Sequence, residues 1–174
     1  LYDAVTSGAA LTADLQVLLD AALRLHEQYH FFHWELAFPE VFFDQRGQLI
    51  PSGGFDAVVG NPPYVRQELI KPYKPYFESQ YQIYNGKADL YLYFYERGLQ
   101  LLNAERRVGY ITSGTFMNSD SAKSFRQHIH QNAAFERVIN FAENLPFKGA
   151  EMVYPTIAVL RNGQAQDTFR SLFI

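Results

Sequence analysis

Apolar and polar positions along the chain alternate between a helical and a strand-like period, which predicts helices interleaved with strands. One helix is predicted from Leu11 to about Tyr29, with Thr12 or Asp14 as its N-cap. Its apolar stripe comprises Leu15, Leu18, Leu19, Ala22 and His26. Asp89 is predicted to cap a strongly apolar helix that runs to about Leu102, and another helix is predicted over Ser121–Asn132. Buried strands are predicted at Phe55–Val59, Val108–Thr112, Glu136–Phe141 and Val153–Leu160.

Strands separated by helices indicate an α/β fold with a doubly wound, largely parallel sheet. The continuous apolar run Phe55–Val59 is typical of a sheet that is covered on both faces. The last two strands are joined by a loop without a long helix, so we expect them to form an antiparallel pair. Residues 31–54 are predicted to be an irregular aromatic connection ending in the turn Pro51–Gly54, and residues 65–88 a long, functional loop.

The most informative segment follows the first predicted strand. After Gly60, the chain continues Asn61-Pro62-Pro63-Tyr64, which predicts a rigid corner at the carboxyl edge of the sheet. Ligands of open α/β sheets bind at that edge. The proline after Asn61 restricts the asparagine to extended conformations, so the corner is expected to hold its shape.

Such a corner suits the activation of a weakly nucleophilic amine such as the exocyclic nitrogen of adenine. The side-chain oxygen of Asn61 and the carbonyl of Pro62 are two acceptors for the two N–H bonds of that amine. Preorganised dipoles of this kind stabilise developing charge without rearrangement. Tyr64 offers a ring on which the base can stack, worth about 1–3 kcal/mol. Because a base within a duplex cannot reach the corner, it must be flipped out.

These residues resemble the catalytic motif of the amino-group DNA methyltransferases that form N6-methyladenine from S-adenosylmethionine. The segment Phe32–Phe42, the glycines Gly53-Gly54 and the strand at Phe55 are similar to the combined restriction–modification methylases of type IIG and their relatives. The resemblance extends from about Phe31 to about Asn162. It implies a partial Rossmann-like methyltransferase fold, methyl transfer to a flipped adenine in double-stranded DNA, and a separate target-recognition domain. It also implies catalytic roles for Asn61, Pro62, Pro63 and Tyr64.

Two later segments carry the same resemblance. Val108–Phe116 followed by Ser121–Ile129 is similar to the strand, turn and helix beyond the catalytic strand of this family. Leu145-Pro146-Phe147, ahead of the strand at Tyr154–Leu160, resembles the loop whose aromatic residue packs on the flipped base, which implies Phe147 as a second base contact, with a hydrophobic anchor of the loop as the alternative. Thr115 and Phe116 either line the pocket or pack in the core.

Composition and charge limit the remaining possibilities. The chain has 174 residues, a length typical of one domain, and it has no cysteine and a net charge of −3. The lack of cysteine excludes disulfides and thiolate zinc sites, and together with the absence of a signal peptide or membrane-spanning run it favours a cytoplasmic protein. The net charge argues against a general polyanion binder, but the loop after Tyr64 is mildly basic. Its candidates for contacts with the DNA backbone, each otherwise a solvated loop residue, are Arg66, Lys71, Lys74 and Lys87.

The cofactor-binding elements implied by the resemblance are missing upstream of Phe55. No strand followed by a glycine-rich turn precedes it, and the acidic residues nearest the start, Asp3, Asp14 and Asp20, lie in or around a predicted helix. We therefore expect residues 1–174 to be the catalytic and base-binding half of a methyltransferase domain, with Asn61 at the fringe of the S-adenosylmethionine site. The remaining part of the parent enzyme is then a partner, and the isolated piece is expected to be inactive.

Two alternatives stay open. The segment His26-Glu27-Gln28-Tyr29-His30 matches H-E-x-x-H, which on a helix places two imidazoles for zinc with a glutamate as base, but no convincing third ligand follows. A non-catalytic nucleic-acid-binding or target-recognition module would use the tyrosine-rich loop without chemistry. No nuclease constellation stands out, so none is assigned.

Overall fold

A computed structural model describes residues 11–142, 154–164 and 168–174. Contacts divide the chain into two compact units, Leu1–Glu40 and Val41–Ile174. In the described ranges, none of the helices combines the length and apolar character needed to cross a membrane.

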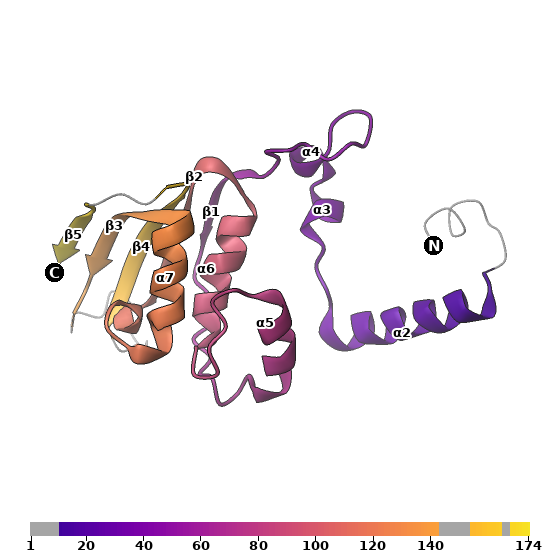
Figure 1. Ribbon diagram of the computed structural model, residues 1–174, viewed down its shortest axis with the longest axis horizontal. Coiled ribbons are helices and arrows are strands. Elements are labelled where there is room, and N and C mark those ends of the chain that lie inside the picture. Colours follow the sequence, from indigo (N-terminus) through magenta and orange to yellow (C-terminus); the bar gives the residue numbers. More distant parts are fainter. Residues whose placement is uncertain (1–10, 143–153, 165–167) are drawn as a thin grey trace. The chain divides into compact units, whose positions relative to one another are not determined.

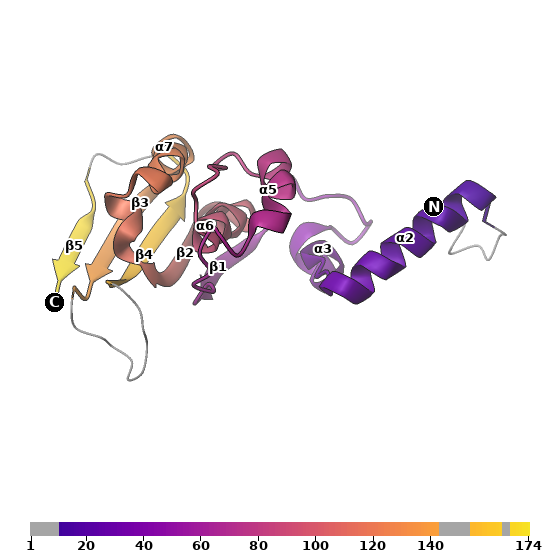
Figure 2. The ribbon, with the colours of Figure 1, turned by 90° about the horizontal axis from the view of Figure 1, so that it is seen from below.

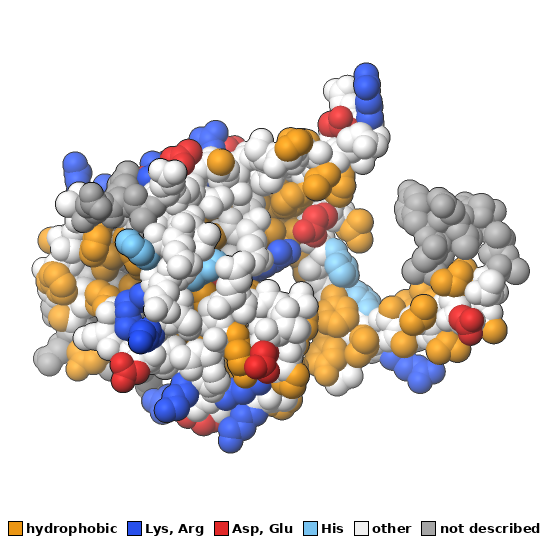
Figure 3. Space-filling model, viewed as in Figure 1, with side chains coloured by type: hydrophobic (Ala, Val, Ile, Leu, Met, Phe, Trp, Pro, Cys, Tyr) orange, Lys and Arg blue, Asp and Glu red, His pale blue; other side chains and the backbone are white. Residues whose placement is uncertain are grey.

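The first unit is built around the predicted amphipathic helix. Helix α2 runs from Ala13 to Tyr29, and the side chain of Thr12 caps it by accepting a hydrogen bond from the backbone N–H of Leu15. None of the residues of α2 is buried. Hydrophobic side chains gather along this helix in Figure 3 (orange). The short helix α3, Trp34–Ala37, follows, and the rings of Trp34 and Phe38 stack with centroids 6.1 Å apart.

The second unit contains a five-stranded sheet in the order β1-β2-β4-β3-β5 (Figure 1). The strands are β1, Phe55–Gly60; β2, Leu102–Ser113; β3, Ala133–Asn140; β4, Pro155–Asn162; and β5, Arg170–Phe173. Strand β1 pairs with β2 in parallel and β5 pairs with β3 in parallel, whereas β4 lies between β2 and β3 and is antiparallel to both. The predicted antiparallel pair of β3 and β4 is therefore confirmed. Strand β5 was not predicted.

Helices α6, Leu90–Gln100, and α7, Lys123–Asn132, lie on one face of this sheet, as Figures 1 and 2 show. The core between helices and strands is rich in aromatic residues; its fully buried members include Tyr95, Phe116 and Phe125. Burial of such large apolar surfaces is the main source of stability in this unit. Single-turn 3₁₀ segments at Gly114–Met117 and Asp120–Ala122 connect β2 to α7. Helix α4, Pro39–Phe42, precedes the sheet.

Three expectations for this unit are corrected by the structure. Strand β1 is not covered on both faces by described residues, because the side chain of Val59 is 84% exposed. Residues 65–88 are not merely a loop, since they contain a 3₁₀ turn at Lys71–Tyr73 and helix α5, Lys74–Gln80. Asp89 stands at the N-cap position of α6 but makes no capping hydrogen bond with its side chain.

Gly54, directly before β1, permits a close approach to the neighbouring strand β2. A Cβ atom at Gly54 would lie 2.6 Å from the backbone of Leu102 and Asn103. A side chain at this position would push β1 away from β2, so glycine is required for the pairing that carries the corner.

Candidate active site

The predicted corner forms directly after β1, at the carboxyl edge of the sheet. Pro62 is buried and holds the turn in place, whereas Asn61 is exposed. The backbone N–H of Val65 donates to the carbonyl of Pro63 at 3.0 Å. No described residue donates a hydrogen bond to the carbonyl of Pro62. The corner thus presents an acceptor without an internal partner next to an exposed amide.

Tyr64 connects the corner to the next strand. Its hydroxyl lies 2.5 Å from the side-chain oxygen of Asn61 and 3.0 Å from the backbone oxygen of Ile111 in β2. Burial raises the pKa of Tyr64 above its usual value of 10.0, so the hydroxyl keeps its proton and acts as a donor. A hydroxyl has one proton, so it donates to one of these oxygens at a time. The ring of Tyr64 remains 43% exposed and is accessible to a planar ligand.

The end of β2 supplies a second turn at the same edge. The hydroxyls of Ser113 and Thr115 lie 3.0 Å apart, and Thr115 also lies 3.1 Å from the hydroxyl of Tyr91 in α6. Burial raises the pKa of Tyr91 to about 12, so this group also stays protonated at neutral pH. Thr115 is exposed at the edge, whereas Phe116 is buried and stacks on Phe135 at 5.9 Å. Of the two candidates for lining the pocket, Phe116 therefore belongs to the core.

Residues 65–88 are held in shape by three polar anchors. The buried carboxylate of Glu96 accepts hydrogen bonds from the backbone N–H groups of Gln82 and Ile83 at 2.9 and 3.0 Å. The carboxylate of Asp89 accepts from the backbone N–H of Gln67 at 2.9 Å, and burial raises its pKa. Sequence reasoning missed Glu96; the available signal was a lone carboxylate within an otherwise apolar helix.

The third anchor is Lys74, whose ammonium donates to the side chain of Gln67 at 2.6 Å and to the carbonyl of Gly86 at 2.5 Å. This side chain closes the segment on itself. The other three basic candidates of the segment are exposed; they are Arg66, Lys71 and Lys87.

Two sequence-based candidates fall elsewhere. Phe147 lies outside the described residues. Helix α2 ends at Tyr29, and His30 takes the left-handed conformation with φ of 50°, so the two imidazoles of the H-E-x-x-H match are not on one helical turn. The described part of the chain also contains no group of three or more His, Cys, Asp or Glu residues placed to hold a metal ion.

The described residues do not form a complete site for S-adenosylmethionine. Between residues 11 and 54 they contain α2, α3, α4 and one isolated bridge between Phe43 and Leu49, with no strand followed by a glycine-rich turn. A place for Asn61 at the fringe of the cofactor site stays a prediction.

Comparison with known proteins identifies the family. Residues 9–147 match the model of the Eco57I restriction-modification methylase family. The chain belongs to this family. The chain is 38% identical over 109 residues to the type II methyltransferase M.BstVI of Geobacillus stearothermophilus. The aligned region covers 62% of this chain and 19% of that protein. It is 33% identical over 110 residues to M.PaeR7I of Pseudomonas aeruginosa, covering 63% of this chain and 19% of that protein. This methylase chain thus spans about a fifth of the length of these relatives.

Solved structures confirm the fold predicted for this methylase. A class I S-adenosylmethionine-dependent methyltransferase from Listeria monocytogenes superposes with a TM-score of 0.57 at 15% identity, covering 75% of this chain and 40% of that one. The type IIG restriction endonuclease BpuSI gives 0.52 at 21% identity, covering 68% and 15% of the two chains. The methylase therefore has a partial Rossmann-like methyltransferase fold, and its family and fold imply S-adenosylmethionine as the methyl donor.

Proposed function

We propose that this chain carries the catalytic corner of an adenine-specific DNA methyltransferase, which transfers a methyl group from S-adenosylmethionine to the N6 nitrogen of a flipped adenine. The observation that carries the proposal is the corner after β1, where exposed Asn61 stands beside the unoccupied carbonyl of Pro62. The family match and the relatives named as type II methyltransferases support it.

In the proposed mechanism, two acceptors hold the amine of the base. The side-chain oxygen of Asn61 and the carbonyl of Pro62 each accept one of its N–H bonds, which localises the nitrogen lone pair and directs it away from the ring plane. Pro62 and Pro63 keep these dipoles fixed, so they need not reorganise as positive charge develops on the nitrogen. S-adenosylmethionine, when bound, would supply an electrophilic methyl group on a sulfonium, with the thioether as leaving group, and the methylated amine would release one proton to solvent.

Tyr64 has two tasks in this proposal. Its exposed ring stacks on the flipped base, and its hydroxyl orients the amide of Asn61. When the substrate amine occupies the Asn61 oxygen, the hydroxyl retains a hydrogen bond by donating to the carbonyl of Ile111 instead. Phe147 remains the proposed second base contact.

The segment that follows the corner is proposed to face the DNA backbone. Exposed Arg66, Lys71 and Lys87 are placed to meet phosphates, while Lys74 has its ammonium bonded within the segment. Anchoring by Glu96 and Asp89 fixes the course of the segment, which reduces the entropy lost on binding.

The remaining requirements are proposed to come from a longer protein. A cofactor half with the glycine-rich loop and a target-recognition domain would complete a cytoplasmic restriction–modification enzyme. Because this chain spans 19% of its relatives' length, we expect no methyl transfer by the 174 residues alone.

The test is labelled-methyl transfer from S-adenosylmethionine to unmethylated genomic DNA of the native host, using the longer protein that contains this chain. Label recovered as N6-methyladenine is the expected product. Asn61→Ala should slow its formation by at least about 100-fold, while the matched control Gln131→Ala, an exposed amide on α7, should leave it unchanged. Label recovered on cytosine, or full activity of Asn61→Ala, would refute the proposal.

A further inference from the structure

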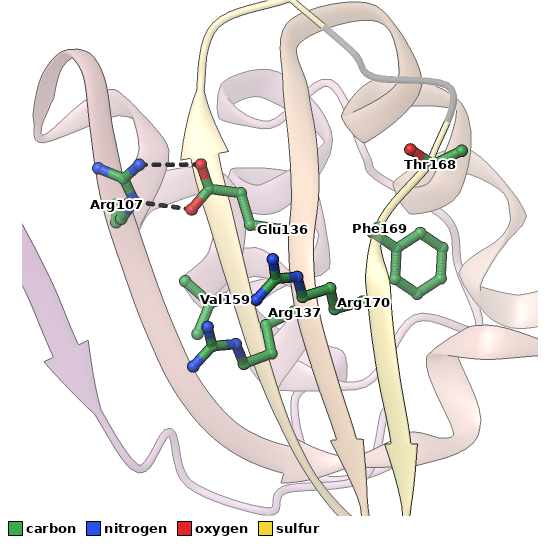
Figure 4. Close-up of a pocket in the computed structure, with 7 residues that line it drawn as sticks. All are labelled: Arg107, Glu136, Arg137, Val159, Thr168, Phe169 and Arg170. Carbon is green, nitrogen blue, oxygen red and sulfur yellow. Dashed lines mark hydrogen bonds and ion pairs between the residues drawn. The ribbon is translucent and has the colours of Figure 1, made fainter.

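A polar groove lies on the face of the sheet opposite α6 and α7, away from the corner. It has a volume of about 530 Å³, and its lining includes Arg107, Glu136, Arg137 and Arg170 (Figure 4). Arg137 and Arg170 come from β3 and β5, whereas the corner follows β1. Since β1 and β3 are three strand spacings apart in the sheet, Arg137 and the corner are separated by about 14 Å across the strands.

Part of the charge in this groove is compensated internally. Arg107 binds the carboxylate of Glu136 through two hydrogen bonds of 2.7 and 2.9 Å. Arg161 lies 3.4 Å from the same carboxylate and also pairs with Glu105. Glu136 is therefore already shared by two guanidinium groups.

Arg137 and Arg170 have no such compensation. They are register partners on neighbouring parallel strands, and Figure 4 shows both side chains extending over the same part of the sheet. Among the described residues, no hydrogen bond or ion pair is formed by either guanidinium. Like charges directly opposite each other destabilise a sheet, so this pair is a cost unless an anion lies between the two groups.

The chemistry of the pair favours phosphate over carboxylate. A carboxylate has two oxygens and one negative charge, and in this groove the guanidinium of Arg107 alone bonds both oxygens of Glu136. Two adjacent guanidinium groups need more acceptor oxygens and more negative charge than one carboxylate has, and a tetrahedral phosphate group provides both. Thr168 adds a hydroxyl at the rim, and the ring of Phe169 is 53% exposed beside it.

We propose that Arg137 and Arg170 form a phosphate-binding site in this groove. The phosphate has two chemically equivalent sources, the backbone of DNA and a free phosphate-bearing small molecule. Phosphate binding itself does not rest on the proposed methyl transfer; only the DNA source does. Binding is therefore measured without any methylation readout.

The experiment titrates the full chain with inorganic phosphate at low ionic strength and follows the arginine Nε–Hε signals by NMR. The signals of Arg137 and Arg170 should shift and saturate together. The double variant Arg137→Gln/Arg170→Gln should bind phosphate at least about tenfold more weakly, as loss of charge-assisted hydrogen bonds predicts. The matched control Arg24→Gln/Arg46→Gln removes the same charge from exposed positions elsewhere and should leave phosphate affinity unchanged.

A second arm separates the two sources. Fluorescence anisotropy with a labelled DNA duplex is recorded over a range of salt concentrations for the wild type and both double variants. If DNA supplies the phosphate, the slope of log affinity against log salt should become shallower by about 1 in the groove variant only. If the phosphate affinity falls but this slope does not change, the ligand is a free phosphate-bearing molecule.

Two outcomes overturn the proposal. In one, phosphate produces no saturable shift, or it binds the groove variant and the wild type equally well. In the other, acetate binds the wild type as tightly as phosphate, which would assign the groove to a carboxylate from an acidic protein segment. Arg137→Lys/Arg170→Lys, which retains charge but loses both forks, should give an intermediate phosphate affinity.

Discussion

The two turns at the carboxyl edge of the sheet are built in opposite ways. The corner after β1 uses few of its acceptors: Asn61 is exposed and its side-chain oxygen is bonded by the hydroxyl of Tyr64, and the Pro62 carbonyl has no described donor. The turn after β2 uses its polar groups internally, since the hydroxyl of Thr115 lies 3.0 Å from that of Ser113 and 3.1 Å from that of Tyr91. Both turns follow parallel neighbours and therefore meet at one edge.

The corner after β1 is thus suited to bind a substrate, whereas the turn after β2 supports the structure. Prolines can hold a corner rigid without using its hydrogen-bonding groups, because they restrict φ and donate nothing. A turn of serine and threonine is held by the same groups that it would need for a ligand. The hydroxyl of Tyr64 joins the two turns through Ile111, so the supported turn fixes the reactive one.

The largest effect on methyl transfer is expected from Asn61→Ala in the longer protein. Because the corner loses one of its two proposed acceptors, we expect kcat for methyl transfer to fall by about 10²- to 10³-fold. The free energy of unfolding should stay within about 0.5 kcal/mol, since Asn61 is exposed. Single-turnover methylation and urea unfolding measure the two effects. Unfolding of the variant would assign Asn61 a structural role instead.

Tyr64 gives the next largest effect. Tyr64→Ala removes a stacking surface worth about 1–3 kcal/mol and should weaken target-base capture by roughly 5- to 150-fold. Tyr64→Phe keeps the ring and should retain most of that affinity. The fluorescence of 2-aminopurine at the target position reports base capture for both variants. Equal losses in the two variants would mean that the hydroxyl, not the ring, holds the base.

Substitutions in the turn after β2 should change the free energy of unfolding and not the rate of methyl transfer. Thr115→Val leaves the buried hydroxyl of Tyr91 without this partner and should lower the free energy of unfolding by about 1–3 kcal/mol. The double variant Tyr91→Phe/Thr115→Val removes both groups and should be closer to the wild type. Urea unfolding of Thr115→Val, Tyr91→Phe and the double variant, compared with the wild type, gives the coupling energy of the two hydroxyls as a double-mutant cycle. A double variant as unstable as the sum of its single variants would show that the two hydroxyls are not coupled.

The smallest effect is expected from pH. Burial raises the pKa of Tyr64 above 10.0 because the phenolate is penalised, so the hydroxyl remains protonated up to that pH. Base capture by the wild type and by Tyr64→Phe should therefore follow parallel pH profiles from neutral pH to about 10. A decline of the wild type within this range that Tyr64→Phe lacks would show that the tyrosine ionises earlier.

Local pattern was sufficient to predict the strand at Phe55 and helices α2, α6 and α7, because each depends on periodicity within a short segment, whereas α3, α4 and α5 were not predicted. The antiparallel pair was predicted from the lack of a long helix between its two strands. Sequence could not predict the bonds between Tyr64 and Ile111 or between Glu96 and Ile83, since they join residues that only the fold brings together. The expectation for β1 failed for a related reason: an apolar run indicates what a strand can bury, not which described residues cover it. Strand β5, with Arg170, lacked an apolar alternation strong enough to be recognised.

The position of β4 has a consequence for the order in which the sheet is assembled. In the described sheet, the backbone pairing that joins the β1–β2 half to the β3–β5 half is made by β4, which is formed by residues 155–162. During synthesis, β2 and β3 emerge from the ribosome well before the strand that joins them. The nascent chain must therefore keep two strand edges open until β4 arrives, and these edges are where a chaperone or a wrong partner strand would compete for pairing.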